Sequence, residues 1–353
     1  MDTKKKLELI KEVGEEIIGE DELIELLKSK KKIIAYDGFE PSGRIHIAQG
    51  LLRTINVNKL TKAGIHFKFW VADWFALMND KLDGDLEKIK IVGKYFIEVW
   101  KACGMDTKNI EFIWASESMT QDYWLSVLKI AKLNTVKRIT RCAQIMGRSE
   151  SGTLSSAQIF YPVMQAADIF HLETDIAQLG MDQRKVNVLA REVAQKIGKK
   201  KPIAIHHHML MGLTEPKDEG LVGADAAIAK KMSKSNPNSA IFMTDSTEEV
   251  NQKFKKAFCP EGIAEDNPVL EYCKYIVFEK VKQLDIERPE KFGGNISFET
   301  YEELEKAFVA KEVHPMDLKN ATAKYIDEFL QPIREHFKKN KEAKKLLEQV
   351  NSF

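Results

Sequence analysis

The side chains best suited to chemistry in this chain stand in two short segments far apart in the sequence. The first starts with an apolar strand at residues 33–36, passes through a turn rich in Gly, Pro and Ser at 38–43, and enters a helix that carries His46 near its start. Such a turn leaves backbone N–H groups free at the helix N-terminus, where the helix dipole favours negative charge. The segment is therefore predicted to bind a phosphate group.

The second segment has the sequence KMSKS at residues 231–235, which places Lys231 and Lys234 three positions apart among small polar residues. A loop of this kind can act as a mobile clamp on phosphates whose negative charge grows in a transition state. Either segment alone is a weak signal, because glycine-rich turns and Lys/Ser loops are common. Together, and in this order, they predict chemistry at the phosphates of ATP.

Composition limits the other possibilities. The chain has 353 residues, of which 44% are hydrophobic and 30% charged, and a net charge of +1, so any nucleic acid must bind through a local patch. Its four cysteines form no C-x-x-C pair, which argues against a zinc site or a disulfide framework and favours a reducing, cytoplasmic compartment. No apolar run approaches the roughly 18 residues that a membrane span needs.

Strands and helices alternate from residue 32 to about residue 209. Strands are predicted at residues 33–36, 66–72, 110–115, 174–178 and 203–206, and helices at 47–62, 86–102 and 184–197. This alternation predicts an α/β fold with a mostly parallel, doubly wound sheet of the Rossmann-like kind that binds nucleotides.

The remaining segments have helical patterns. Residues 1–30 are predicted to form an amphipathic helical leader, and about residues 120–170 an inserted helical layer within a catalytic domain that spans 31–245. After the lysine loop no strand signal is visible, so residues 246–353 are predicted to form an all-helical C-terminal domain.

Several ordered motifs give the chain a more specific likeness. They are GFEPSG at 38–43, YPVMQAAD at 161–168, GMDQRK at 180–185, PEKFGG at 289–294 and HPMDLK at 314–319. With these motifs, the region from about residue 33 to residue 330 resembles the tyrosyl-tRNA synthetases of the archaeal and eukaryotic cytosolic kind, which are class I aminoacyl-tRNA synthetases. The leader and the last twenty or so residues are predicted to lie outside the resemblance.

The resemblance implies a two-step reaction. L-Tyrosine attacks the α-phosphorus of ATP, with Mg²⁺ on the phosphates, and tyrosine then passes from tyrosyl-adenylate to the 3′ end of tRNA(Tyr). The catalytic residues would be His46, Gln49, Lys231 and Lys234, and the ATP site would add Gly38, Gly43, Ala48, Met232 and Ser233. The family usually has His-Ile-Gly-His where this chain has His46-Ile47-Ala48-Gln49, so Gln49 can donate a hydrogen bond but cannot be cationic.

The resemblance also assigns the tyrosine pocket. Tyr36 and Asp168 would hold the phenol hydroxyl, and the side chains that hold the amino group or line the pocket would be Tyr161, Gln165, Gln183 and Phe75. Asp168 stands in an apolar run, where an unpaired carboxylate would be costly, so a hydroxyl partner suits it. A site that pairs with a hydroxyl rejects phenylalanine without an editing domain.

In the C-terminal region the resemblance assigns anticodon recognition to Phe292, His314 and Asp317. An aromatic ring in the Gly-flanked loop at 291–294 can stack on an unpaired base. A carboxylate at a helix start can accept from a guanine, although it can also serve only as a partner of the helix dipole. The family further implies a homodimer formed through the inserted helical layer.

Other functions stay open from the sequence. Tryptophanyl-tRNA synthetase shares the scaffold, and a catalytically reduced, synthetase-derived RNA-binding protein is suggested by Ala48 and Gln49. The run His206-His207-His208 could suggest a metal, but neighbouring side chains on a strand point to opposite faces, so no metal site is predicted. A position at a strand end beside the nucleotide fits that run better.

Overall fold

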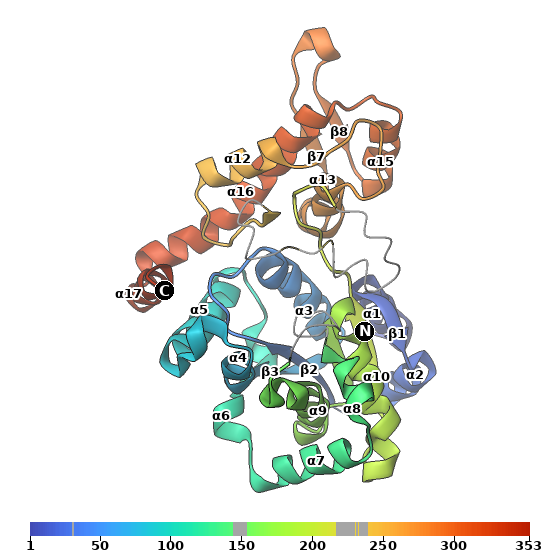
Figure 1. Cartoon of the computed structure of the whole chain (residues 1–353). Helices are drawn as coiled ribbons and strands as arrows, with labels where there is room; N and C mark the ends of the chain where they lie inside the picture. Colours follow the sequence, from blue (N-terminus) through green and yellow to red (C-terminus); the bar gives the residue numbers. More distant parts are fainter. Residues whose placement is uncertain (30–31, 144–153, 217–229, 231, 233–238) are drawn as a thin grey trace.

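A computed structural model describes residues 1–29, 32–143, 154–216, 230, 232 and 239–353. Its centre is a six-stranded sheet, ordered β1-β6-β5-β2-β3-β4 (Figure 1). The strands are β1 (Gly14–Ile18), β2 (Ile33–Phe39), β3 (Ile65–Val71), β4 (Ile110–Trp114), β5 (Ile176–Gly180) and β6 (Ile203–His207). Strands β2 to β6 pair in parallel, which confirms the α/β, doubly wound fold predicted from the sequence.

The sheet order also locates the site. The chain runs from β2 outward to β3 and β4, and then returns to place β5 on the other side of β2. Between β2 and β5 the crossovers therefore change direction, and open α/β sheets bind ligands outside the carboxyl ends of their strands at such a point. Tyr36 and Ala177 pair in register across this junction.

Helices cover both faces of the sheet, so its central strands are largely buried; all five residues of β5 are. One apolar cluster joins the β2 and β3 residues Phe39, Phe67 and Phe69 to the helices α3 and α5, and the other joins Tyr36 and Trp70 to α7, α9 and α10. The helical segments of this part are α1 (Thr3–Val13), α2 (Glu20–Lys28), η1 (Ala48–Leu52), α3 (Arg53–Lys62), α4 (Asp73–Met78), η2 (Lys81–Gly84), α5 (Leu86–Ala102), η3 (Thr107–Asn109), α6 (Ala115–Ser118), α7 (Gln121–Lys132), α8 (Val136–Thr140), α9 (Ser156–His171), η5 (Met181–Gln183), α10 (Arg184–Ala194) and η6 (Gln195–Ile197).

The N-terminal leader contains helices, as predicted for residues 1–30, but a strand that was not predicted lies between them. The helix α1 ends at Val13, and the next residues form β1, which pairs antiparallel with β6, the outermost strand of the parallel part of the sheet. Gly19, at φ +95°, then turns the chain into α2. A helical pattern over two short segments concealed the strand between them, because β1 gains its ladder partners only from β6, far along the sequence.

The C-terminal region is mostly helical, as predicted, but it is not free of strands. Its helices are α12 (Thr247–Lys256), α13 (Pro268–Tyr272), η8 (Cys273–Val277), α14 (Phe278–Lys280), η9 (Glu290–Phe292), α15 (Tyr301–Val309), α16 (Pro315–Lys339) and α17 (Lys341–Asn351). Two three-residue strands, β7 (Leu284–Ile286) and β8 (Ile296–Phe298), form an antiparallel pair near one tip of the molecule (Figure 1). The prediction of an all-helical region is therefore wrong at this point, because three residues are too few to show a period.

Residues that follow the lysine loop connect the two regions. The buried Asp245 carboxylate pairs with Arg44 at 2.9 Å and with Lys253. The backbone carbonyl of Asp245 accepts a hydrogen bond from Arg334 of α16 at 2.9 Å. The apolar cluster on the α3 and α5 side also continues into α12 and α16. Within the described part of the chain, no helix is both long and apolar enough to cross a membrane.

Candidate active site

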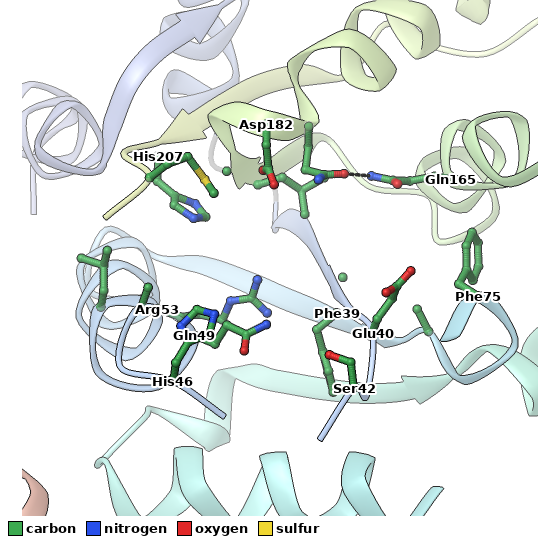
Figure 2. Close-up of a pocket in the computed structure, with 18 of the residues that line it drawn as sticks. Phe39, Glu40, Ser42, His46, Gln49, Arg53, Phe75, Gln165, Asp182 and His207 are labelled. Atoms are coloured by element: carbon green, nitrogen blue, oxygen red, sulfur yellow. Dashed lines mark hydrogen bonds between the residues drawn. The ribbon is translucent and has the colours of Figure 1, made fainter. Parts of the chain in front are cut away.

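A cavity of about 580 Å³ opens at the carboxyl ends of β2, β5 and β6, where the crossovers change direction. Figure 2 shows His46, Gln49 and Arg53 on one wall, Phe75 and Gln165 at the far end, and His207 and Asp182 opposite. The predicted site residues that line the cavity are Tyr36, Gly38, His46, Ala48, Gln49, Phe75, Tyr161, Gln165, Asp168, Gln183 and Met232. The fold thus brings together side chains that the sequence spreads over almost two hundred positions.

One end of the cavity is built around the Asp168 carboxyl of α9. The Tyr36 hydroxyl donates to one of its oxygens at 3.4 Å, and the Tyr123 hydroxyl of α7 donates to the other at 2.9 Å. Burial raises the pKa of Asp168 well above its ordinary value, although the two hydroxyl hydrogen bonds oppose that rise. Each carboxyl oxygen keeps a second lone pair, so the group can accept a further hydroxyl from a ligand.

Tyr123 was not predicted from the sequence. It belongs to the inserted helices, and its hydroxyl lies between the Asp168 carboxyl and the Met164 carbonyl, which is 3.1 Å away. Its own position carries no motif, so only the packing of α7 against α9 reveals it.

Polar groups continue along the same wall. The Tyr161 hydroxyl donates to Glu40, whose carboxylate also accepts from Asn79 at 3.2 Å, and the Phe75 ring meets the Tyr161 ring edge-on at 4.8 Å between centroids. The Gln165 amide donates to Gln183 at 2.9 Å (Figure 2). Glu40 belongs to the GFEPSG motif and was missed as a site residue, although it is an acidic group well placed to meet an ammonium.

The opposite wall is the start of the helix after β2. Backbone hydrogen bonds from Ile47 to Ile241 at 2.8 Å and from Met243 to Ile45 at 3.0 Å join this wall to the segment that follows the lysine loop. The Trp100 indole donates to the Gln49 backbone carbonyl at 2.7 Å, while the Gln49 side-chain oxygen is buried and no described residue pairs with it. Gln49 therefore has an acceptor left for a ligand.

Glycines shape this turn in different ways. A Cβ on Gly38 would lie 2.7 Å from the Tyr36 hydroxyl, so only glycine leaves that phenol in place. Gly43 adopts φ +99°, a conformation that glycine reaches without strain, and it does not line the cavity. Its role, on the described geometry, is to form the turn.

The lysine loop can be placed only in part. Lys231, Ser233 and Lys234 lie outside the described residues, whereas Met232 is 5% exposed and lines the cavity. The Tyr272 hydroxyl lies 3.7 Å from the Met232 sulfur. This contact fixes one point of the loop at the cavity.

The three consecutive histidines have different surroundings. His206 is buried and hydrogen-bonds to Glu16 at 2.8 Å and to Asn187 at 3.0 Å, whereas His207 and His208 line the cavity.

Burial lowers the pKa of His207 to about 3, with the Arg53 charge adding to the effect. Burial also favours a neutral His208, but its hydrogen bonds to Glu15 and Glu271 raise its pKa to about 9. Among the described residues, no three His, Cys, Asp or Glu side chains form a group that could hold a metal.

The predicted anticodon residues stand apart from the cavity, in the C-terminal region. His314 caps α16 by accepting from the Met316 N–H at 3.1 Å, and Asp317 lies in the first turn of the same helix. Phe292 ends the short η9 turn ahead of Gly293, which adopts φ +98°. His314 is exposed and Asp317 half-buried, so both can be reached by a partner.

Comparison with known families defines the class of protein. The model of a family described as tRNA synthetases class I (W and Y) matches residues 28–331, which is most of the chain. The chain belongs to this class I synthetase family.

Individual relatives narrow the likeness. The cytoplasmic tyrosine–tRNA ligase 1 of Arabidopsis thaliana is 50% identical over 356 residues, which cover all of this chain and 89% of the relative. The Pyrococcus horikoshii tyrosyl-tRNA synthetase complexed with L-tyrosine has a TM-score of 0.92 at 39% identity, with both chains covered in full. The Leishmania major tyrosyl-tRNA synthetase complexed with tyrosinol has a TM-score of 0.90 at 47% identity, and this chain spans about half (52%) of that protein.

These matches correct one prediction and weaken one alternative. The similarity reaches both ends of the chain, so the leader and the last residues are part of it, contrary to the prediction. A tryptophanyl-tRNA synthetase from Aeropyrum pernix is only 19% identical, with a TM-score of 0.70, and shares the fold alone.

Proposed function

We propose that this enzyme is a tyrosine–tRNA ligase, which activates L-tyrosine with ATP and transfers it to tRNA(Tyr). The observation that carries the proposal is the Asp168 carboxyl at the closed end of the cavity, held by the Tyr36 and Tyr123 hydroxyls. The Asp168 carboxyl can accept a hydrogen bond from a third hydroxyl, that of the tyrosine substrate. An indole presents one N–H and no hydroxyl, so tryptophan uses this end less well.

The chemistry of the first step needs positioning more than proton transfer. The tyrosine carboxylate is already ionised at neutral pH and attacks the α-phosphorus of ATP, whose bond to pyrophosphate breaks. The protein holds the two reactants in line and neutralises charge on the departing pyrophosphate. We propose that Lys231 and Lys234 neutralise this negative charge, and that His46 and Gln49 at the helix start also contact the phosphates.

We place the amino end of tyrosine beside Tyr161, Gln165 and Gln183, with Glu40 as a nearby carboxylate. Mg²⁺ bound with the ATP phosphates would need few protein ligands, and Asp182 or Glu40 could supply them. That fits a cavity in which Asp182 and Glu40 are the acidic lining residues besides the deeply placed Asp168. The ion would offset phosphate charge.

ATP–pyrophosphate exchange tests the activity. Exchange should require ATP, Mg²⁺ and tyrosine, and phenylalanine or tryptophan at the same concentration should support almost none. Exchange with phenylalanine or tryptophan at the tyrosine rate would reject the assignment, and absence of exchange with every amino acid would instead favour a non-catalytic RNA-binding protein.

We further propose that residues 246–353 bind the anticodon of tRNA(Tyr) through Phe292, His314 and Asp317. Replacing Asp317 by alanine should leave the melting temperature and tyrosine exchange unchanged but weaken charging of tRNA(Tyr). The loss should shrink when the wobble guanine of the tRNA is replaced, because the carboxylate then has no partner to lose. Equal charging ratios across anticodon variants, with reduced stability, would leave Asp317 only a helix-dipole role.

A homodimer is the proposed assembly. Large apolar side chains are exposed on α7, α8 and α9 and at the residue that follows α7: Trp124, Leu125, Leu128, Leu133, Val136 and Phe160. Covering these helices with a second copy would bury that surface. Sedimentation should give about twice the 40.3 kDa mass of one chain, and a monomer would contradict the proposal.

The domain division and the compartment remain proposals of the same kind. We divide the chain into a leader (1–30), a catalytic domain (31–245) and an anticodon-binding domain (246–353). We place the enzyme in the cytoplasm, because its Arabidopsis relatives carry that word in their names.

A further inference from the structure

One basic side chain in the cavity has no part in the mechanism so far. Arg53 is the first residue of α3, one helical turn beyond Gln49, and its side chain enters the cavity beside Gln49 and His46 (Figure 2). The side chain is 12% exposed, and its Nη1 group is buried with no hydrogen-bond partner among the described residues. A buried guanidinium N–H left unpaired is costly, so it is a candidate for pairing with a ligand.

A buried carboxylate forms an ion pair with this guanidinium. Asp37 of β2 has no exposed surface, and its Oδ2 lies 3.3 Å from the Arg53 Nε. Asp37 points to the α3 side of the sheet, opposite to Tyr36, because neighbours on a strand alternate. The guanidinium also lies over the Trp100 ring, 5.8 Å from the ring centroid. Asp37 and Trp100 thus fix Arg53 at the cavity, and no described residue pairs with its Nη1.

Other charges on the lining make Arg53 distinctive. Of the described lining residues, only Arg53 and Lys81 are lysine or arginine. Lys81 lies 3.7 Å from Glu40, at the tyrosine end. His208 is committed to Glu15 and Glu271, and His207 stays neutral near pH 7 because burial and the Arg53 charge lower its pKa to about 3. Arg53 therefore supplies the permanent positive charge of the wall that carries Gln49.

We propose that Arg53 is a catalytic residue that binds the phosphates of ATP, that Asp37 is the positioning residue that holds it, and that it provides the charge that Gln49 lacks. This inference rests on the proposed function for the identity of the nucleotide. A guanidinium presents several N–H donors in a planar fork, which suits phosphate oxygens.

The test needs a variant that removes the charge without leaving Asp37 unpaired. R53Q alone leaves the buried Asp37 carboxylate without its ion-pair partner, which is destabilising in itself. The informative protein is therefore the double variant D37N/R53Q, in which two neutral amides replace the ion pair. R53K keeps the charge without the fork, and K62Q removes an exposed charge from the same helix as a control.

Two measurements are made on each protein. Calorimetric titration with adenosine, AMP and ATP gives nucleotide affinity without any reaction, and ATP–pyrophosphate exchange gives kcat and KM for ATP and for tyrosine. In D37N/R53Q we expect kcat/KM for ATP to fall on the order of 10²-fold. The loss of affinity should grow from adenosine to AMP to ATP, tyrosine KM should change little, R53K should recover much of the loss, and K62Q should match the parent.

Two results would overturn the proposal. Parent-like ATP affinity and exchange in D37N/R53Q would mean that Arg53 only neutralises Asp37. An equal loss for adenosine and ATP, or parallel losses in tyrosine KM and melting temperature, would mean a contact with the nucleoside or a purely structural role. The titrations need no tyrosine, so they decide the role of Arg53 even if the parent fails to activate tyrosine.

Discussion

Replacing Asp168 by alanine is expected to abolish most of the preference for tyrosine over phenylalanine. A site built to pair with a hydroxyl rejects the analogue without it by about 10⁴–10⁵, a range established on an enzyme of this same family. The D168A change removes the acceptor and leaves the Tyr36 and Tyr123 hydroxyls without their buried partner. Because the preference rests on this acceptor, the ratio of the kcat/KM values for tyrosine and phenylalanine should lose most of that range, roughly 10³-fold.

The ratio must be measured with matched variants, because a cavity in α9 can also lower stability. D168N keeps the volume and Y36F keeps Asp168 with one hydroxyl fewer, so both should lose less discrimination than D168A. Melting temperatures identify any variant that is simply unfolded. If D168N and Y36F both retain the parent's tyrosine/phenylalanine ratio, these residues belong to the core and do not bind the phenol.

Loss of either loop lysine is expected to slow adenylate formation by about 10²–10³-fold, the usual effect of removing one preorganised donor to developing charge. Lys231→Ala and Lys234→Ala should leave tyrosine binding almost unchanged, because charge grows on pyrophosphate only as the bond to the α-phosphorus breaks. Single-turnover formation of tyrosyl-adenylate measures that step directly.

Ser235→Ala is the control, since it alters the same loop without removing a charge. A rise in tyrosine Kd that matches the lost rate would make the lysines ground-state binders. The same kinetics in the lysine variants and S235A would mean that the loop acts through its conformation alone.

Much of the architecture could be predicted because its signals are local. The strands β2 and β6 begin with short apolar runs, β3 alternates apolar with other side chains, and α5 has a clear helical period over Leu86–Ala102, as observed. The parts that were missed gain their structure from distant partners. The strand β1 exists because β6 offers an edge, and β7 and β8 exist because they pair with each other across a loop.

The site divides in the same way. Asp168 could be assigned because it ends the YPVMQAAD motif, and Tyr36 because it stands on the strand just before GFEPSG. The fold brings their side chains within 3.4 Å. Tyr123 and Arg53 carry no motif, and only the packing of their helices brings them to Asp168 and to the cavity. Their roles depend on neighbours far away in the sequence, which spacing along one chain does not report.

One competition experiment tests the central claim, that the closed end of this cavity selects a phenol. Enzyme, ATP, Mg²⁺, tRNA(Tyr) and an equimolar mixture of all the protein amino acids are incubated together, and mass spectrometry identifies the amino acid esterified to the tRNA. The cavity built around Asp168, Tyr36 and Tyr123 predicts tyrosine alone at the 3′ end. Tryptophan or phenylalanine on the tRNA in amounts comparable with tyrosine would contradict it.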